Sequence, residues 1–232
     1  MVPLSFANHE FALTTSGALY WPGEAALLVA DLHLEKASFY AGHGQMLPPY
    51  DSRETLERVA LAIRETGARR VFTLGDNFHD SEGSVRLEPH AAGMLSALTR
   101  AVDWVWITGN HDPHMEARTG GTIAEEIAVA GMVLRHEAKQ GETRPEFSGH
   151  FHPRLHISVR KRRIRKPCAV VSTPDNDSGY GGRMILPAFG ALTGGMDAAD
   201  PAIINALQPA SRIDAMLPAA GKLVQFPLWK SG

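Results

Sequence analysis

The chain has 232 residues, of which 44% are hydrophobic and 21% charged, so a disordered or low-complexity polymer is excluded. Its 23 lysines and arginines nearly balance 25 aspartates and glutamates, which excludes a uniformly basic nucleic-acid coat protein. The single cysteine, Cys168, excludes an internal disulfide and any site built from several thiolates. No apolar run approaches the roughly 20 residues that span a bilayer, and no signal-like pattern opens the sequence, so we expect a cytoplasmic protein without membrane contact.

The first half of the sequence alternates strand and helix patterns. A buried strand is expected to end at Asp31. Asp51, with Glu54 three residues later, is expected to cap a helix that carries apolar residues at helical spacing until Gly67. The predicted segments are a hairpin over 11–21, strands over 25–30, 70–74 and 102–108, and helices over 51–67 and 88–100. This order is typical of α/β layering.

The second half is richer in strand patterns. Strands are predicted over 132–138, 155–160, 168–172, 184–189 and 223–226, with a loop-rich stretch over 190–218. Because no internal repeat or clear linker interrupts the chain, we predict one domain over 1–232, made of two packed sheets flanked by helices. Its part over 154–232 is expected to be the richer in strand.

Four short segments place polar side chains where a predicted apolar strand ends. They are Asp31-x-His33, Gly75-Asp76-Asn77, Gly109-Asn110-His111-Asp112 and Gly149-His150-x-His152. Side chains two residues apart on an extended segment share one face, so each such pair can converge on one ion. Oxygen and imidazole donors without thiolate suit Mn, Fe, Zn or a mixed pair and disfavour Ca or an iron–sulfur cluster.

The order of these motifs, with a lone His136 before the last of them, resembles the calcineurin-like metallophosphoesterase superfamily over 31–153. Three segments also resemble a bacterial subfamily, the ligase-associated DNA-damage-response endonucleases: 31–36, 186–190 and 193–195. The resemblance implies a four-layer α-β-β-α sandwich of two mixed sheets flanked by helices, with a two-metal site between the sheets.

The resemblance also implies which residues bind the two divalent ions, expected to be Mn²⁺, with Fe, Zn or a mixed pair as alternatives. One ion would be bound by Asp31, His33, Asp76 and His152. The other would be bound by Asp76, Asn110, His136 and His150. Asp76 would bridge them, and water activated by the metals would attack phosphorus while His111 assists the leaving oxygen and Asp112 orients the His111 ring.

Two residues depart from the expected pattern. The superfamily often has an acidic residue three positions after the bridging Asp76, where this chain has His79. His79 is expected either to support a ligand or to face the substrate. Asn77 stands where the subfamily is expected to be apolar, and we interpret it as an Asx turn that stabilises its loop.

The strongest charge feature is Arg160–Lys166, with six basic residues in seven. It either binds a nucleic-acid backbone or forms a solvated hairpin tip, and an extended chain would place it on the order of 25 Å from the metals. Phe39 and Tyr40 either stack on bases or pack internally. Cys168 is expected to be a buried small residue.

The resemblance implies a dinuclear metal-dependent phosphodiesterase that acts as a DNA endonuclease in bacterial DNA repair. Its substrate would be single-stranded or unpaired DNA, and its functional associates a DNA ligase, a helicase and an exonuclease. Two alternatives are a phosphomonoesterase or small-nucleotide phosphodiesterase, and a non-catalytic binding scaffold of the same fold. The scaffold predicts missing ligands or a missing His111, whereas the sequence contains the whole set.

Overall fold

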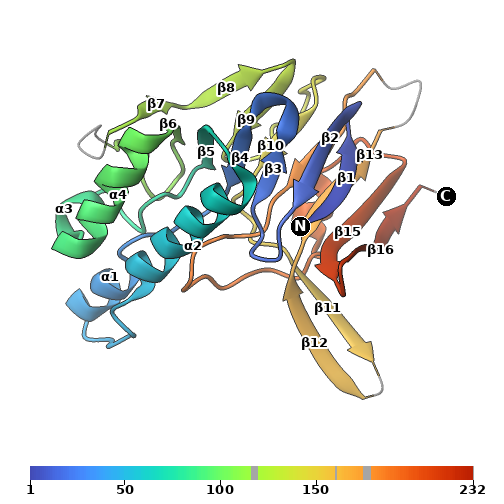
Figure 1. Ribbon diagram of the computed structural model, residues 1–232. Coiled ribbons are helices and arrows are strands. Elements are labelled where there is room, and N and C mark those ends of the chain that lie inside the picture. The colour runs from blue at the N-terminus through green and yellow to red at the C-terminus, as the bar shows by residue number, and fades with distance from the viewer. Residues whose placement is uncertain (116–119, 160, 175–178, 232) are drawn as a thin grey trace.

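A computed structural model describes residues 1–115, 120–159, 161–174 and 179–231 (Figure 1). Within these residues the strands form two seven-stranded sheets and one separate two-stranded hairpin. The first sheet keeps chain order from edge to edge: β1 (Val2–Phe6), β2 (His9–Leu13), β3 (Leu19–Trp21), β4 (Ala26–Val29), β5 (Arg70–Leu74), β6 (Asp103–Ile107) and β7 (Thr122–Ala124). Strands β1 to β4 are antiparallel neighbours, and β4 to β7 are parallel.

The second sheet is also mixed. Across the sheet its strands are β16 (Lys222–Lys230), β15 (Arg212–Ala219), β13 (Ala169–Thr173), β14 (Arg183–Ile185), β10 (Glu146–Ser148), β9 (Met132–Arg135) and β8 (Glu126–Val129). Strands β14, β10 and β9 are parallel, and the other neighbours are antiparallel. The prediction of two mixed sheets is therefore confirmed.

Helices cover the outer faces of both sheets. They are α1 (Lys36–Gly42), α2 (Asp51–Thr66), α3 (Gly83–Arg86), α4 (Pro89–Ala101) and α5 (Pro201–Ala206), with a short 3₁₀ turn over Pro22–Glu24. Helices α2 and α4 pack on the first sheet, and α5 packs on the second. No helix in the described part of the chain is long and apolar enough to cross a membrane.

Alternation along the strands accounts for the layers, as β4 illustrates. Ala26 and Leu28 belong to the apolar layer between the two sheets, whereas Leu27 and Val29 face the helices. Since β4 is buried on both faces, it is a continuous apolar run. Both sheets contribute to the central layer, and the prediction of one domain over 1–232 stays a prediction.

Two helix starts differ in how they are capped. Glu88 caps α4, because its carboxylate accepts hydrogen bonds from the backbone N–H groups of His90 and Ala91. Asp51 was expected to cap α2, but its carboxylate accepts a hydrogen bond from the Ala37 backbone N–H at 3.0 Å. This contact ties α2 to α1 instead.

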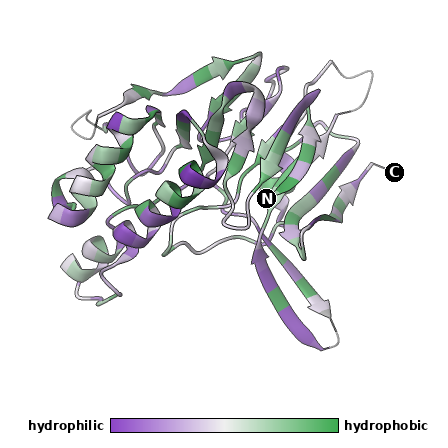
Figure 2. Cartoon of the chain, viewed as in Figure 1, coloured by the Kyte–Doolittle hydropathy of each residue, from purple (hydrophilic) through white to green (hydrophobic). Residues whose placement is uncertain are grey.

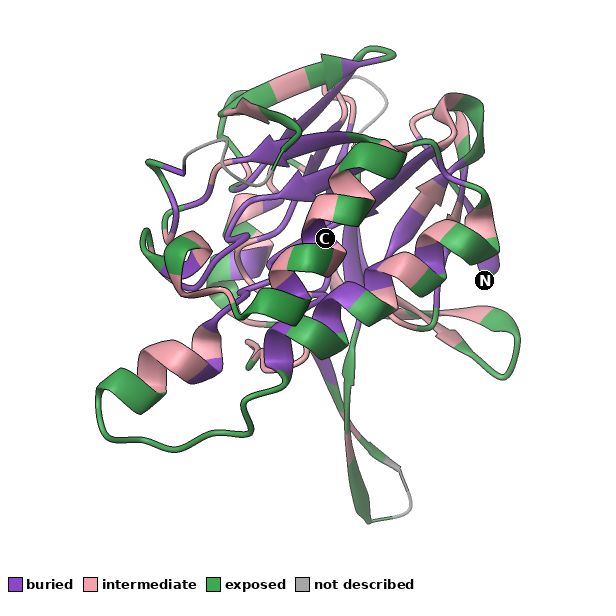
Figure 3. Ribbon diagram, turned by 60° about the vertical axis from the view of Figure 1, so that its left-hand side comes forward, coloured by how far each residue is buried: buried purple, intermediate pink, exposed green. Residues whose placement is uncertain are grey.

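The expected loop over 190–218 is wrong in two places. It contains α5, which Asp200 caps by accepting from the Ala202 N–H, and most of β15. The basic segment is also a strand: β11 (Arg154–Val159) and β12 (Arg162–Pro167) form a hairpin that extends away from the sheets (Figure 1). Arg160 lies outside the described residues. Figure 2 shows β12 to be hydrophilic along most of its length, and Figure 3 shows that most of the described hairpin is exposed.

Candidate metal centre

The polar strand ends meet where the two sheets face each other. Because β4, β5 and β6 are parallel neighbours, Asp31, Asp76 and Asn110 follow them at one edge of the first sheet. His136 directly follows β9, and His150 comes two residues after the parallel strand β10. The His150 backbone N–H donates to Asp31 Oδ1 at 3.0 Å, so the two sheets contact each other at this point.

The first group of donors contains Asp31, His33, Asp76 and His152, with one ligand atom of each within 4.8 Å of the others. His33 Nε2 lies 3.2 Å from His152 Nε2 and 3.6 Å from Asp76 Oδ2. His152 Nε2 lies 3.6 Å from Asp31 Oδ1. Asp31, His33 and Asp76 are buried, whereas His152 is half-buried.

The second group surrounds the amide oxygen of Asn110. His136 Nε2 lies 2.9 Å and His150 Nδ1 3.0 Å from Asn110 Oδ1. His136 Nε2 also lies 3.4 Å from Asp76 Oδ1. Asp76 thus turns Oδ2 toward the first group and Oδ1 toward the second, so the structure brings all seven expected ligands together.

The donor set fits cations. His136 Nδ1 lies 3.0 Å from the Leu74 carbonyl oxygen, which can only accept, so Nδ1 bears the ring proton. In the neutral ring, which is the form that binds metal ions, His136 Nε2 is a lone pair that faces the lone pairs of Asn110 Oδ1. Two acceptors at this separation repel each other unless a cation lies beside them, and the buried carboxylates Asp31 and Asp76 favour the same charge.

The protonation of the imidazoles agrees with this role. Burial, reinforced by the nearby His152, lowers the pKa of His33 to about 2. Burial followed by the neighbouring His136 also lowers the pKa of His150. Near pH 7 both rings are therefore neutral, which is the state that binds metal ions.

His111 lies at the edge of this centre. Its backbone N–H donates to Asp76 Oδ1 at 3.0 Å, and its Nε2 lies 3.9 Å from Asp76 Oδ2. Its Nδ1 lies 2.7 Å from the main-chain carbonyl oxygen of His79, which must accept. Nδ1 thus bears a proton, and Nε2 faces the centre from a half-exposed side chain.

Asp112 was expected to orient the His111 ring, but its described hydrogen bonds are to other groups. Its Oδ2 accepts from the backbone N–H groups of Asn77 at 2.8 Å and Phe78 at 3.2 Å, and its Oδ1 accepts from that of Gly109 at 2.8 Å. Asp112 therefore joins the loops after β5 and β6. The ring of His111 is oriented by a carbonyl, which no side-chain pattern in the sequence reveals.

His79 is buried between the centre and α1. Its Nδ1 lies 3.4 Å from His33 Nδ1, and its ring stacks on His111 at 5.1 Å between centroids. Its ring also contacts Phe39 edge-on and Tyr40 by stacking, at 4.8 and 5.6 Å between centroids. His79 thus contacts both His33 and His111, and the half-buried rings of Phe39 and Tyr40 pack against it. A contact of His79, Phe39 or Tyr40 with substrate stays a prediction.

Asn77 joins two strand ends. Its Nδ2 donates to the Ile107 carbonyl oxygen at 2.8 Å, which is a contact between loops in place of the expected Asx turn. Lys36 was missed as part of the site, although it closes the motif over 31–36. Lys36 is half-buried, and its charge contributes to the lowered pKa values of His33 and His79, so it supplies positive charge beside the centre.

The backbone at the centre is left-handed. Five expected ligands have positive φ: Asp31 (52°), His33 (45°), Asp76 (47°), His150 (72°) and His152 (48°). Gly75 precedes Asp76 at φ 80°, and a Cβ added there would overlap the His136 ring. The loops thus turn sharply enough for side chains of one segment to converge.

The chain is similar to known phosphoesterases. A family model of calcineurin-like phosphoesterases matches residues 26–178, so the chain belongs to that family. A solved structure of a Pseudomonas putida nuclease, MPE, is similar, with 26% sequence identity, a TM-score of 0.67, and coverage of 93% of this chain and 95% of that chain. No curated protein matches the chain significantly. The chain is thus a metallophosphoesterase, a hydrolase of phosphoester bonds, and its fold extends over nearly the whole length of a nuclease.

Proposed function

We propose that the chain is a metal-dependent DNA endonuclease that hydrolyses phosphodiesters. The observation that carries the proposal is the pair of donor groups joined by Asp76, whose two carboxylate oxygens face different groups. Similarity to a nuclease favours a nucleic-acid substrate, and the exposed cations of β12 supply a surface for its backbone.

Asp31, His33, Asp76 and His152 would hold one divalent ion, and Asp76, Asn110, His136 and His150 the other. When bound, such a pair lowers the pKa of water and offsets negative charge on phosphate oxygens. As the imidazolium, with a proton on each ring nitrogen, His111 would donate from Nε2 to the leaving oxygen while the His79 carbonyl accepts from Nδ1. Asp112 would only position the loops after β5 and β6, because its carboxylate oxygens accept hydrogen bonds from the backbone N–H groups of Asn77 and Gly109.

Biological context is proposed from the resemblance of 31–36, 186–190 and 193–195 to the ligase-associated endonucleases. The substrate would be single-stranded or unpaired DNA in a bacterial repair pathway, with Mn²⁺ as the metal. A DNA ligase, a helicase and an exonuclease would act in the same pathway.

The test offers a covalently closed single-stranded DNA circle to the Mn²⁺-loaded protein, beside a phosphomonoester. A circle has no ends, so its conversion to a line requires an endonuclease. We expect cutting that a chelator abolishes and that His111→Ala reduces strongly. If the circle survives while the monoester is hydrolysed, the DNA assignment is wrong and the phosphomonoesterase alternative holds. If neither substrate reacts although both metals are bound, the scaffold alternative holds.

A further inference from the structure

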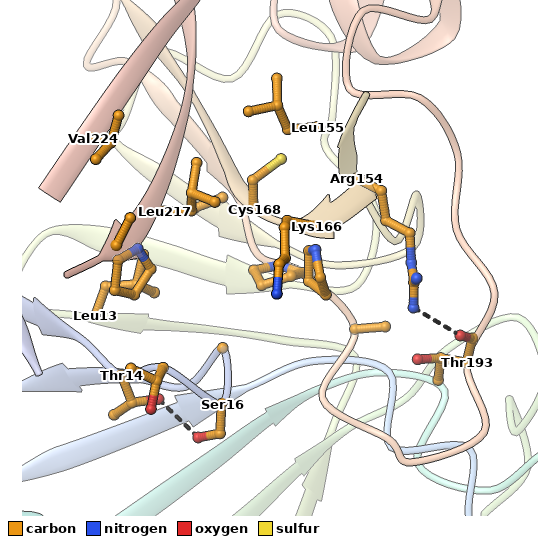
Figure 4. A pocket seen from close by; sticks show the side chains of 18 of the residues that line it. Leu13, Thr14, Ser16, Arg154, Leu155, Lys166, Cys168, Thr193, Leu217 and Val224 are labelled. Atoms are coloured by element: carbon orange, nitrogen blue, oxygen red, sulfur yellow. Dashed lines mark hydrogen bonds between the residues drawn. The ribbon is translucent and has the colours of Figure 1, made fainter. Parts of the chain in front are cut away.

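A cavity of about 640 Å³ lies at the root of the β11–β12 hairpin (Figure 4). Its volume is within the range of roughly 300–1,000 Å³ that is usual for ligand pockets. Its walls come from the hairpin root, the turn between β2 and β3, the segment 187–193, and the adjoining ends of β15 and β16. No residue of the donor groups described above lines it.

The lining of the cavity is mainly apolar, with the hydroxyls of Thr14 and Ser16 on the side of the β2–β3 turn. Leu155, Ile157 and Ile164 come from one face of the hairpin, and Leu217 lies on the β15 side. Cys168 also lines it, and burial raises the pKa of this thiol to about 12, so the side chain is uncharged near pH 7. This lining suits a largely apolar group.

Cations surround that interior. Arg58, Arg154 and Lys166 line the cavity, and Lys166 is exposed. Arg154 donates to the Thr193 carbonyl oxygen at 3.1 Å, which fixes its position and uses one of its five N–H donors. The guanidinium of Arg58 lies over the ring of Phe189, 4.9 Å from its centroid. Each arginine thus has a fixed charge and further donors for an anion.

The cavity and the metal centre share parts of their walls. Arg154 comes two residues after His152, which is at most about 7 Å of extended chain. On the other side, Gly190 lines the cavity and its N–H donates to the main-chain carbonyl of Asp31 at 3.3 Å. A strand held at the metals can therefore reach the cavity within a few nucleotides.

We propose that this cavity receives one unpaired base of a single-stranded nucleic acid whose scissile phosphodiester lies at the metal centre, while Arg154, Lys166 and the exposed cations of β12 bind neighbouring phosphates. The inference rests on the proposed function and deepens it. A base has apolar faces and is flanked by phosphates, which matches an apolar interior beside cations. A duplex keeps its bases paired and stacked, so the cavity selects unpaired strands.

The first experiment measures the abasic register, which is the fixed number of nucleotides between a missing base that impairs cutting and the cut itself. Labelled single-stranded oligonucleotides, each with one stable tetrahydrofuran abasic unit at a different position, are cut by the Mn²⁺-loaded wild-type protein under single-turnover conditions. We expect cutting to fall about 5- to 100-fold at one fixed offset, within a few nucleotides of the missing base. Cutting that is indifferent to the abasic unit at every offset overturns the proposal.

The second experiment fills the cavity. Ala219 is exposed at its edge, so Ala219→Trp adds bulk there with little risk to folding, and Ala219→Ser is the matched control. The tryptophan variant should raise the protein concentration for half-maximal cutting about 5- to 100-fold and abolish the abasic register, whereas the serine variant should keep both. A tryptophan variant that cuts with the wild-type register contradicts the proposal. If it fails to fold, the wild-type abasic series alone decides.

The third experiment tests the phosphate contacts. Replacing Arg162, Arg163 and Arg165 with serine should lower the slope of log affinity against log salt concentration by about 2, since each single-strand phosphate contact contributes about 0.7. The matched control replaces Arg64, Arg69 and Arg100, which are exposed on other elements, and removes the same charge. Equal slopes in the two triple variants overturn the assignment of the hairpin.

These outcomes separate the two proposals. A wild-type protein that leaves the DNA circle intact overturns the proposed function. A protein that cuts the circle but has no abasic register keeps that function and loses the base pocket. If, in addition, a fatty acid raises the thermal midpoint of the wild type but not of Ala219→Trp, the cavity is a site for anionic amphiphiles.

Discussion

Charged side chains are buried at two neighbouring places, one in the second sheet and one where the two sheets face each other, and they are neutralised in opposite ways. In the first, Arg135 Nη1 lies 3.2 Å from Glu146 Oε2, and Arg135 Nη2 lies 2.9 Å from Glu142 Oε2. Arg183 Nε lies 3.8 Å from Glu146 Oε1. Here the chain supplies its own counter-ions. We call Arg135, Arg183, Glu142 and Glu146 the arginine cluster.

The metal centre begins one residue further along, at His136. Its buried carboxylates, Asp31 and Asp76, face imidazoles such as the neutral His33 instead of arginines. The two donor groups contain no lysine or arginine, and Lys36 supplies one positive charge beside them, so bound divalent ions would supply the rest. The arginine cluster therefore stabilises the fold by itself, whereas the metal centre depends on bound ions.

Asp76→Asn would break the metal side of this comparison most strongly. It removes a charge and the bridging group, so we expect hydrolysis to fall about 10³-fold or more, as several kcal/mol of metal stabilisation are lost. Without metals, its thermal midpoint should equal or exceed that of the wild type, because Asp31 loses a like-charged neighbour. Metal analysis, initial rates and unfolding in chelator measure these effects. Full metal occupancy with wild-type rates would contradict the assignment.

His111→Ala should reduce hydrolysis by about 10²- to 10⁴-fold, the usual contribution of a proton donor at a leaving group. Metal content should not change, since His111 is outside the two proposed donor groups. His114→Ala is the matched control, because His114 is exposed three residues later. Initial rates and metal stoichiometry are measured together. Loss of metal in His111→Ala would make this residue a ligand, with His33 and His79 as its neighbours.

Arg135→Met tests the arginine cluster. It leaves the fully buried Glu146 short of a counter-ion, so the free energy of unfolding should fall by about 3–5 kcal/mol. Arg144→Met removes an exposed partner of Glu142 and should change stability little. Urea unfolding of both variants measures this difference. Equal losses would mean that burial does not distinguish the two arginines.

Glu142→Gln gives the smallest effect, seen as a change in pH dependence. The hydrogen bond from Arg144, with a further one from Arg135, lowers the pKa of Glu142 well below its usual range. A carboxyl whose pKa is lowered in the folded state stabilises the fold above its unfolded pKa of about 4.3, and this stabilisation is lost as pH falls. The variant should therefore lose less stability than the wild type between roughly pH 5 and 3. Urea midpoints across that interval decide, and parallel curves would contradict the expectation.

The sequence predicts the ends of the central strands well, because each changes abruptly from apolar residues to turn and ligand residues. It predicts β9 less well: 132–138 was expected, but the strand ends at Arg135, where the chain turns His136 toward the centre. Strand β10 was missed because its first residue, Glu146, is a charge hidden by the arginine cluster. Strand β12 was missed because its charges indicated a solvated tip.

The same limit applies within the site. The ligand types and their order are visible as side chains, so all seven could be proposed from the sequence. The contact between His111 and the His79 carbonyl, and the backbone N–H groups that bind Asp112, depend on how loops from different strands meet. The Asp200 cap followed by Pro201 was a readable signal for α5 within the segment expected to be loop.

The left-handed backbone at the expected ligands lowers the stability of the fold while it positions the donors. A non-glycine residue in that conformation costs roughly 1–2 kcal/mol, and Asp31, His33, Asp76, His150 and His152 all adopt it. Glycine at any of these positions would relieve that strain while deleting a donor. The convergence of these donors is therefore obtained at a cost in folding stability.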